Sequence, residues 1–411
     1  MAATINERPC SSAASSLGDG KPEFIQKIEN QIARINAIYL LQKEDGVITI
    51  SEDRAIRVLL KRDSGQFWPS IVEFLTSVPL SVYYDEDTLS LLVGMVNGTV
   101  YEYTIAADFN SIQQNRHWEA HTMGVTGVVS SNSARMIFSC SKDKTIVWHC
   151  ADTSVKIGSY LVDSLCTTIK FDPESKICFV GDYNGNIYVL RIVGNSGQQI
   201  SKLSAHTAAI TSLAWDSKRG QLYSGGADSL VIAWDIAGQK GNCYELNGHD
   251  SKISALVLAE NPARLFSVDE SGHLVCWDLK AKRIMAPGWH DHDRCELCDV
   301  PFFWNVKLCW DRKTVGVRRH HCRTCGHSVC GNCCSHFTTF PAMGFEKKTR
   351  ICNTCHSKMQ QYPDQFDLTP LAVQCELNKG IATMCLHEDT GKLAAVSFDR
   401  SIMLWDVSKL L

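Results

Sequence analysis

The stretch GADSLVIAWD (226–235) decides the fold: small residues and an acidic turn residue precede alternating apolar residues that end in Trp-Asp. Similar stretches recur as SEDRAIRVLL (51–60), GMVNGTVYEY (94–103), SKDKTIVW (141–148), GDYNGNIYVL (181–190), VDESGHLVCWD (268–278) and SFDRSIMLWD (397–406). The position of Trp234 is held in the other six by Leu59, Tyr103, Trp148, Leu190, Trp277 and Trp405. The first five spacings are 44, 45, 42, 44 and 43 residues, a period typical of a four-stranded propeller blade. The last spacing, 128 residues, is about 85 too long and indicates an insertion.

The repeat resembles that of the WD-repeat family. Its signature dipeptide stands at Trp234-Asp235, Trp277-Asp278 and Trp405-Asp406, and its Gly-His-like element at Ala120-His121, Ala205-His206 and Gly248-His249. The resemblance implies a buried, hydrogen-bonded set of His, turn Asp and Trp, which His206, Asp228 and Trp234 fit. The chain departs from the pattern where Asn30-Gln31 stand in place of the first Gly-His.

Seven units predict an all-β fold, a seven-bladed WD-repeat β-propeller with an inserted zinc finger. Only Val407–Leu411 follow the last repeat, so we expect EFIQKIE (23–29) to supply the missing outer strand and close the ring. The predicted organisation is a polar N-terminal tail, blades 1–6 with the closing strand, the finger, and the last blade, over residues 1–22, 23–282, 283–366 and 367–411.

Composition excludes several classes of protein. With 411 residues, 45% of them hydrophobic and 21% charged, the chain has enough apolar content for sizeable cores. No apolar run approaches the roughly 18 residues of a membrane span, and the net charge of −3 disfavours a chain devoted to nucleic acid. We also find no phosphate-binding glycine loop, HExxH or nucleophile motif, and therefore expect a protein that is not an enzyme.

Cysteine is concentrated in the insertion. Ten of the 19 cysteines and seven of the 14 histidines lie in residues 289–360, which hold 11 Lys and Arg against 6 Asp and Glu. Eight of these cysteines form four Cys-x-x-Cys pairs: Cys295/Cys298, Cys322/Cys325, Cys330/Cys333 and Cys352/Cys355. Each tetrahedral zinc ion takes four thiolates, so the sequence predicts two Zn²⁺ ions, each bound by two pairs. Cys309 and Cys334 are left over as packed thiols.

RRHHCR (318–323) lies between the metal-binding pairs and matches the basic signature of FYVE zinc fingers. Arg350-Ile351-Cys352 resembles their second motif, and Trp289 with Asp291 resembles their N-terminal Trp-x-x-Asp. His292 occupies the acidic position itself, so Asp291, one residue early, and Asp293, one residue late, are the two candidates for the carboxylate. The whole chain resembles the small WD-repeat- and FYVE-domain-containing proteins. The resemblance implies binding of phosphatidylinositol 3-phosphate: Arg319, Arg323 and Arg350 on the 3-phosphate, Arg318 nearer the 1-phosphate, and His320, His321 and Asp291 on phosphate or ring hydroxyls.

The residues before the basic motif are expected to meet the membrane. By the same resemblance, Val315, Gly316 and Val317 form a loop that enters the bilayer. Two valines bury little area, so stable residence needs the headgroup too, and two fingers acting together in a weak homodimer would add to it. The 23 residues between Cys298 and Cys322 include Pro301-Phe302-Phe303-Trp304 and Trp310. They form either a larger membrane wedge or a segment packed on the propeller or finger.

Two functions compete. The first is a cytoplasmic adaptor, peripheral on early endosomes, whose finger binds phosphatidylinositol 3-phosphate while the propeller docks protein partners, protein kinases among them. The second is a RING-type ubiquitin ligase with the propeller as substrate receptor, because Cys325-Gly-His327-Ser-Val-Cys330 fits a Cys-x-His-x-x-Cys core. The two differ in one ligand, Cys322 for FYVE and His327 for RING, and RING offers no reason for RRHHCR.

Overall fold

The computed structural model describes residues 20–29, 31–42, 45–237, 243–313 and 315–411, so most of the predicted N-terminal tail lies outside the described residues. The described chain forms two compact units. One comprises the residues from 20 to 237 with His249–Leu279 and Val373–Leu411, and the other comprises Cys243–Gly248 and Lys280–Ala372. In the described ranges, no helix has the length and apolar character needed to cross a membrane.

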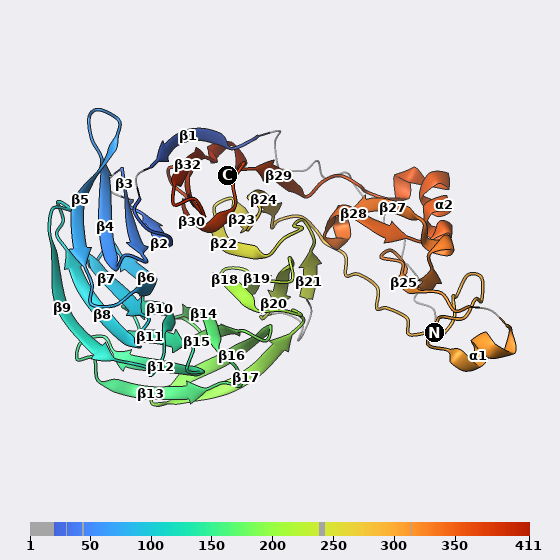
Figure 1. Cartoon of the computed structure of the whole chain (residues 1–411), viewed down its shortest axis with the longest axis horizontal. Helices are drawn as coiled ribbons and strands as arrows, with labels where there is room; N and C mark the ends of the chain where they lie inside the picture. Colours follow the sequence, from blue (N-terminus) through green and yellow to red (C-terminus); the bar gives the residue numbers. More distant parts are fainter. Residues whose placement is uncertain (1–19, 30, 43–44, 238–242, 314) are drawn as a thin grey trace. The chain divides into compact units, whose positions relative to one another are not determined.

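The prediction of seven blades is confirmed by seven four-stranded antiparallel sheets arranged in a ring (Figure 1). Blades 1 to 3 consist of β2 (Ile35–Leu40), β3 (Gly46–Ser51), β4 (Ala55–Lys61), β5 (Phe67–Phe74); β6 (Pro79–Asp85), β7 (Ser90–Met95), β8 (Thr99–Ile105), β9 (Ile112–Glu119); and β10 (Val125–Ser131), β11 (Met136–Ser141), β12 (Thr145–Cys150), β13 (Lys156–Leu161). Blades 4 and 5 consist of β14 (Cys166–Asp172), β15 (Ile177–Asp182), β16 (Asn186–Val193), β17 (Ser196–Ser204); and β18 (Ile210–Asp216), β19 (Gln221–Gly226), β20 (Val231–Asp235), β21 (Cys243–Leu246). Blades 6 and 7 consist of β22 (Ile253–Glu260), β23 (Ala263–Asp269), β24 (His273–Asp278), β29 (Ala372–Glu376); and β30 (Ile381–His387), β31 (Lys392–Ser397), β32 (Ile402–Asp406), β1 (Glu23–Ile28), followed by the short helix η4 (Ser408–Leu410).

The repeated phrase of the sequence is the tight turn between the second and third strands of each blade. One residue in each of these turns has a left-handed φ, between 64° and 94°: Arg54, Gly98, Lys144, Gly185, Ser229, Gly272 and Arg400. The Asp or Asn just before it in most of the turns is a residue type that favours such turns. The apolar residues that follow pack between neighbouring sheets, so that the core lies between blades.

A buried polar network fixes the blades that carry the Gly-His-like element. In blade 5, His206 Nδ1 lies 2.9 Å from Asp228 Oδ1, its Nε2 lies 2.8 Å from Ser224 Oγ, and Trp234 Nε1 donates to the same Oγ at 2.8 Å. The predicted set of His, Asp and Trp is therefore joined by a serine. Blade 6 repeats this arrangement with Ser267.

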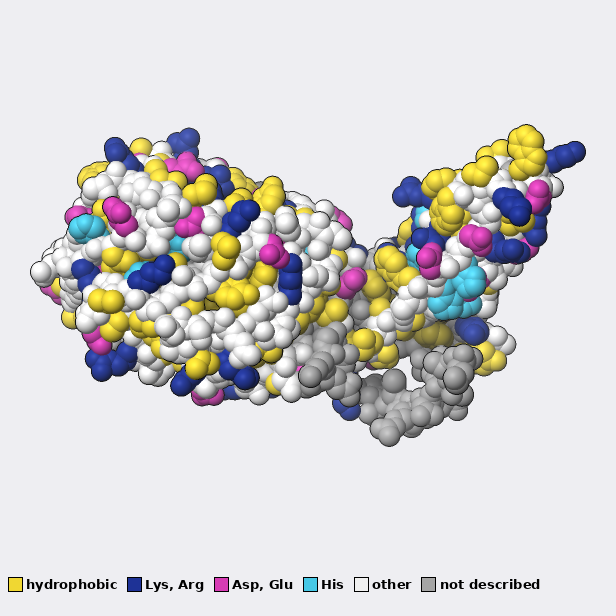
Figure 2. All heavy atoms as spheres, turned by 90° about the horizontal axis from the view of Figure 1, so that it is seen from below, with side chains coloured by type: hydrophobic (Ala, Val, Ile, Leu, Met, Phe, Trp, Pro, Cys, Tyr) yellow, Lys and Arg dark blue, Asp and Glu magenta, His cyan; other side chains and the backbone are white. Residues whose placement is uncertain are grey.

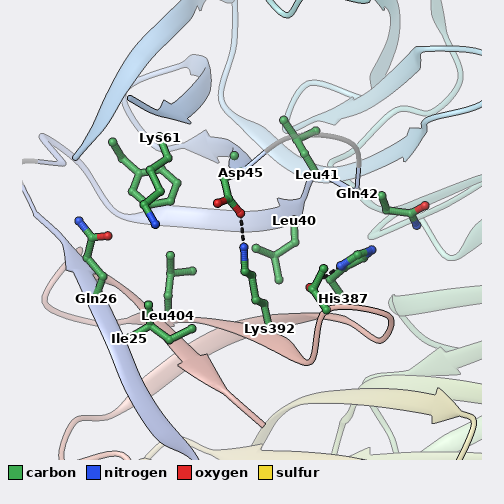
Figure 3. A pocket seen from close by; sticks show the side chains of 13 residues that line it. Ile25, Gln26, Leu40, Leu41, Gln42, Asp45, Lys61, His387, Lys392 and Leu404 are labelled. Atoms are coloured by element: carbon green, nitrogen blue, oxygen red, sulfur yellow. Dashed lines mark hydrogen bonds and ion pairs between the residues drawn. The ribbon is translucent and has the colours of Figure 1, made fainter. Parts of the chain in front are cut away.

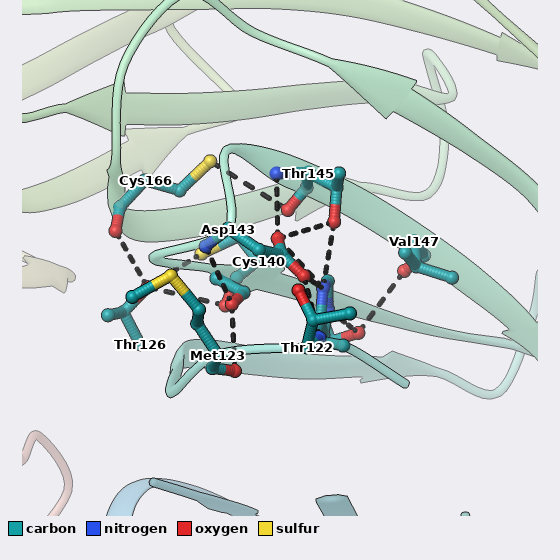
Figure 4. Close-up of polar contacts among 11 residues, drawn as sticks. Thr122, Met123, Thr126, Cys140, Asp143, Thr145, Val147 and Cys166 are labelled. Atoms are coloured by element: carbon teal, nitrogen blue, oxygen red, sulfur yellow. Dashed lines mark hydrogen bonds and ion pairs between the residues drawn. The ribbon is translucent and has the colours of Figure 1, made fainter. Parts of the chain in front are cut away.

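Blades 3 and 1 vary this network. In blade 3, His121 contacts Asp143 and Ser139. Asp143 also accepts a hydrogen bond from Thr145 Oγ1 at 2.6 Å (Figure 4). Trp148 Nε1, however, donates to the carbonyl of Gly194 at 3.0 Å. In blade 1, which lacks the histidine, Arg57 donates to Ser51 Oγ and to the Asp53 carboxylate. Asn30 lies outside the described residues.

These networks predict unequal costs for one kind of substitution. Ser224→Ala orphans two buried groups, His206 Nε2 and Trp234 Nε1, whereas Ser139→Ala orphans only His121 Nε2. An unsatisfied buried polar group costs about 1–3 kcal/mol, so we expect Ser224→Ala to lower the free energy of unfolding by about twice as much as Ser139→Ala. Urea unfolding of the full chain measures both. Equal losses would show that the tryptophan bond contributes nothing.

The ring closes as predicted, with β1 pairing antiparallel with β32 from Glu23↔Asp406 to Ile28↔Ile402. A pocket of about 230 Å³ lies at this seam, lined by β1, blade 1 and blade 7 (Figure 3). Across it Lys392 of blade 7 forms an ion pair with Asp45, beside blade 1. The pocket therefore marks the closure, which apolar packing between blades 7 and 1 also stabilises.

The insertion begins after β24 and ends before β29, and both strands belong to the sheet of blade 6. The finger thus separates the third and fourth strands of blade 6, and the last sheet begins at β30. This differs from the predicted start of the last blade at residue 367, because the strand Ala372–Glu376 carries no recognisable repeat phrase. The elements between are α1 (Val306–Asp311), β25 (Arg319–His321), β26 (Ser328–Cys330), η1 (Asn332–Cys334), β27 (His336–Phe340), η2 (Pro341–Met343), β28 (Phe345–Ile351), α2 (Asn353–Gln361) and η3 (Pro363–Gln365).

Candidate zinc and lipid-binding site

The eight predicted metal ligands gather into two groups of four. The first contains Cys295, Cys298, Cys330 and Cys333, and the second contains Cys322, Cys325, Cys352 and Cys355. The first Cys-x-x-Cys pair therefore joins the third, and the second joins the fourth. This crossed arrangement ties the whole finger together, and most of these thiols lie in its buried core with Phe302, Val329 and Ile351.

The geometry of both groups fits zinc. Cys298 Sγ lies 3.7 Å from Cys330 Sγ, and Cys325 Sγ lies 3.9 Å from Cys352 Sγ. Two thiolates bound tetrahedrally at about 2.3 Å from one ion lie about 3.8 Å apart. Backbone N–H groups of Cys330 and Cys352 donate to Cys295 Sγ and Cys322 Sγ at 3.3 and 3.2 Å, which stabilises the thiolates. The finger thus has the ligands for two zinc ions.

The basic motif is built on β25, between ligands of both groups. Arg319 pairs with Cys330 and His321 pairs with Ser328 across β25 and β26, while Cys322 follows β25 directly. Arg323 N–H donates to the Arg350 carbonyl at 3.1 Å, which brings the second basic motif alongside the first. The structure therefore brings together the predicted basic residues that are far apart in sequence, 318–323 and 350.

Tryptophans cover two of the arginines. The Arg323 guanidinium carbon lies 4.4 Å from the centroid of the Trp289 ring, which also stacks on His321 at 4.9 Å. The Arg319 guanidinium carbon lies 4.6 Å from the centroid of Trp304, and its Nη1 forms an ion pair with Asp291. Cation–π contacts of this kind orient the guanidinium groups.

The two acidic candidates, Asp291 and Asp293, have different partners in the structure. Asp291 reaches the basic motif, whereas Asp293 Oδ2 accepts a hydrogen bond from Asn305, the residue that caps α1. Arg350 Nη1 donates to the carbonyl of Cys334 at 3.0 Å, and the exposed Arg318 has no ion-pair partner within the described ranges.

Burial and nearby positive charge lower the pKa of both histidines of the basic motif. Burial together with the nearby Arg350 and Arg318 lowers the pKa of His320. Burial, Arg319 and Arg323 lower the pKa of His321, against the opposing effect of Asp291. Burial likewise lowers the pKa of the Arg323 guanidinium. Positive charge is thus concentrated around strand β25 by Arg318, Arg319, Arg323 and Arg350, which is the electrostatic requirement for an anion site.

Comparisons with known proteins agree with this geometry. Residues 288–361 match the family model of the FYVE zinc finger, and residues 112–149 and 197–235 match that of the WD domain, G-beta repeat. WD repeat and FYVE domain-containing protein 2 of Caenorhabditis elegans is 50% identical over 407 residues, covering 99% of this chain and 97% of the relative. The chain belongs to the family of WD repeat and FYVE domain-containing proteins.

Other comparisons extend this result. The human WD repeat and FYVE domain-containing protein 2 is 34% identical over the full length of both chains, and mouse protein 1 is 36% identical over all of this chain and 97% of the relative. The crystal structure of the WD40 β-propeller domain of Doa1 has a TM-score of 0.60 at 13% identity, covering 94% of this chain and 96% of that one, which supports the fold alone. Membership in the WD repeat and FYVE family supports, in general, an adaptor that binds phosphatidylinositol 3-phosphate on endosomes.

The RING alternative is not favoured in this member of the WD repeat and FYVE family. It requires His327 as a ligand in place of Cys322, but Cys322 lies with three other cysteines in the second group. His327 lies instead with His290 and Glu296. The ligand that distinguishes the two folds is thus the one expected for FYVE.

The long stretch before the basic motif divides between packing and exposure. Phe302 is fully buried in the core of the finger. Phe303, Trp304, Val306, Trp310 and Val315 are exposed, Trp310 to 83% and Val315 to 91%. Figure 2 shows hydrophobic side chains beside lysine, arginine and histidine on one face of the finger. Neither alternative for this stretch therefore holds throughout, because one aromatic residue packs inward and most of the others face outward.

Sequence reasoning missed the role of Trp304. The motif comparison placed Trp289 near the lipid site, but Trp304 lies 15 positions from Arg319 and carries no motif. No sequence signal links Trp304 to Arg319, because their contact depends on how the finger packs. Gly316 also has a packing reason, since a Cβ there would lie 2.3 Å from the backbone of Phe303.

Proposed function

We propose that this chain is an adaptor recruited to early endosomes by phosphatidylinositol 3-phosphate, with Arg318, Arg319, His320, His321, Arg323, Arg350 and Asp291 forming the headgroup site. The observation that carries the proposal is the strand β25, which holds the basic motif between ligands of two zinc groups. The zinc ions supply rigidity, because their thiolate ligands fix the backbone on both sides of the strand.

The chemistry of the headgroup matches these side chains. A phosphomonoester carries nearly two negative charges and several acceptor oxygens. Arginine meets phosphate with a planar fork of donors, and a ring of arginines supplies several such forks. The carboxylate of Asp291 suits the hydroxyl groups of the inositol ring, which donate hydrogen bonds.

The direct test is liposome co-sedimentation of the full chain with zinc present. Vesicles with phosphatidylinositol 3-phosphate, phosphatidylinositol 4-phosphate or phosphatidylinositol are compared at one salt concentration. We expect selective sedimentation with the 3-phosphate lipid. Equal binding to every anionic vesicle, or no binding, contradicts the proposal.

We propose that the exposed apolar residues near Val315, Gly316 and Val317 form a membrane wedge. Trp310, Val306 and Phe303 extend the predicted loop with side chains that face solvent. Aromatic side chains of this kind partition into the membrane interface. The wedge adds membrane affinity but no headgroup selectivity.

The wedge predicts that Trp310→Ala weakens vesicle binding without changing recognition of the soluble headgroup. Burying one large apolar side chain contributes about 1.5–3 kcal/mol, so the affinity for vesicles should fall about 10- to 100-fold. Titration calorimetry with inositol 1,3-bisphosphate measures the headgroup alone. Trp68→Ala, at an exposed tryptophan on β5 of the propeller, is the matched control. Equal affinities for Trp310→Ala and the control would refute the wedge.

We propose that the propeller docks protein partners, protein kinases among them, as the family resemblance implies.

A weak homodimer would place two fingers on one membrane and raise the apparent affinity through effective concentration. Analytical ultracentrifugation in solution and on vesicles tests the dimer, and affinity capture with propeller-surface variants tests the partners.

A further inference from the structure

We infer that His290, Glu296 and His327 form a third metal site on the finger, separate from the two cysteine groups, which binds a divalent transition ion such as Zn²⁺. These residues come from the segment before the first cysteine pair, from inside that pair, and from the loop after Cys325. One potential ligand atom from each lies within 4.8 Å of the others.

The distances suit an ion after a small adjustment. Ligands bound tetrahedrally at about 2.0–2.2 Å lie about 3.4 Å apart. His290 Nδ1 and Glu296 Oε1 are now 2.8 Å apart, joined by a hydrogen bond, and the whole group spans no more than 4.8 Å. An ion would therefore replace one hydrogen bond, lengthen that contact by about 0.6 Å and draw the more widely separated ligand atoms together.

A buried nitrogen without a partner points to a ligand. Nδ1 of His327 is buried and has no hydrogen-bond partner among the described residues. An unsatisfied buried polar atom costs about 1–3 kcal/mol, and native structures satisfy most of them with protein, water or an ion. The His327 ring also lies close to that of His290, with centroids 4.9 Å apart.

The surroundings hold the ligands in place. Glu296 Oε2 accepts a hydrogen bond from Ser328 N–H at 2.5 Å. The other carboxylate oxygen, Oε1, therefore points toward His290. His290 N–H donates to the Gly326 carbonyl at 2.9 Å, and its own carbonyl accepts from Ser328 Oγ. Contacts of this kind outside the ligand set are typical of built metal sites.

The donor set defines the class of ion. Two imidazoles and one carboxylate are the ligands of open, three-residue zinc sites and also bind Fe²⁺, Co²⁺ and Ni²⁺. Water or His292, whose Nε2 lies 3.7 Å from Glu296 Oε1, would complete the coordination. Such a site has no thiolate, so its affinity and spectrum differ from those of the cysteine groups.

The site adjoins residues that the proposed function uses. His290 lies between Trp289, which covers Arg323, and Asp291, which pairs with Arg319. A bound ion would fix this segment and add positive charge near the basic motif. This consequence rests on the proposed function, whereas the metal site itself does not.

Metal counting tests the inference independently of lipid. Full-length protein is dialysed against buffered micromolar zinc, and bound zinc is measured by mass spectrometry. We expect three ions per chain for the wild type and two for Glu296→Gln and His290→Gln, with three retained in His336→Gln, a histidine of the same finger outside the group. His290 is exposed, so its variant should fold even where Glu296→Gln does not.

A cobalt titration tests whether the ligands of the third ion are nitrogen and oxygen atoms or thiolates. The third equivalent should add d–d absorption without further thiolate-to-cobalt charge transfer. Two ions in the wild type across the zinc range overturn the inference, as does a third ion that persists in both variants. If the wild-type protein bound three ions but did not bind vesicles that contain phosphatidylinositol 3-phosphate, the proposed function would be wrong and the metal site would still be supported.

Discussion

Replacement of Cys322 by serine is expected to remove one of the two sulfur-bound zinc ions, unfold the part of the finger around that ion and abolish lipid binding, while the propeller stays folded. Cys322 is fully buried, shares its group with Cys325, Cys352 and Cys355, and accepts the Cys352 N–H. The apparent binding free energy of a structural zinc ion is about 10–16 kcal/mol, comparable to the 5–15 kcal/mol that stabilises a typical domain. A unit as small as the finger cannot compensate for that loss.

The control is Cys309→Ser, which removes a half-buried thiol of the same finger that belongs to neither group. Zinc released on thiol modification counts the sulfur-bound ions, and urea unfolding followed by circular dichroism reports on the propeller. We expect one sulfur-bound ion in Cys322→Ser and two in the control. Two ions in both would show that Cys322 is no ligand and would restore the RING arrangement.

The propeller was predictable because each blade repeats one turn and one apolar strand. The left-handed residue at Ser229 or Gly272 and the strand after it are local features, so a short stretch specifies them. The fourth strand of blade 6 was not predictable in the same way. Val373 and Cys375 in β29 lack a turn phrase, and their sheet partner β24 lies about 95 positions earlier in the sequence. Strand pairing over such a separation leaves no local pattern.

The functional site was also predictable only in part. Spacing alone identified the eight cysteines, because a tetrahedral ion demands four thiolates in pairs that one turn can present. Spacing did not say which pairs join, since the crossed arrangement of Cys295 with Cys330 and of Cys322 with Cys352 depends on tertiary packing. The contacts of Arg319 with Trp304, and of His290 with Glu296, depend on that crossing and leave no signal in the sequence.

Arg319→Ala is expected to lower the affinity for phosphatidylinositol 3-phosphate vesicles about 100-fold or more, since each hydrogen bond to a charged group contributes about 1.5–3 kcal/mol and a phosphate receives two from one arginine. The folded finger should survive, because the partners of Arg319, Asp291 and Trp304, are themselves solvent-exposed. Surface plasmon resonance on immobilised vesicles measures the change.

Lys358→Ala removes the same charge from an exposed position on α2, and we expect its affinity to stay within about twofold of the wild type, since an isolated surface charge is screened by salt. Arg319→Lys keeps the charge but lacks the planar fork, so it should fall between the two. This order separates recognition of the phosphate from attraction to an anionic surface. If all three variants lost affinity equally, the finger would be responding to charge density alone. If Arg319→Lys bound as tightly as the wild type, a point charge would suffice at this position, and the planar forks that read the headgroup would come from Arg318, Arg323 and Arg350.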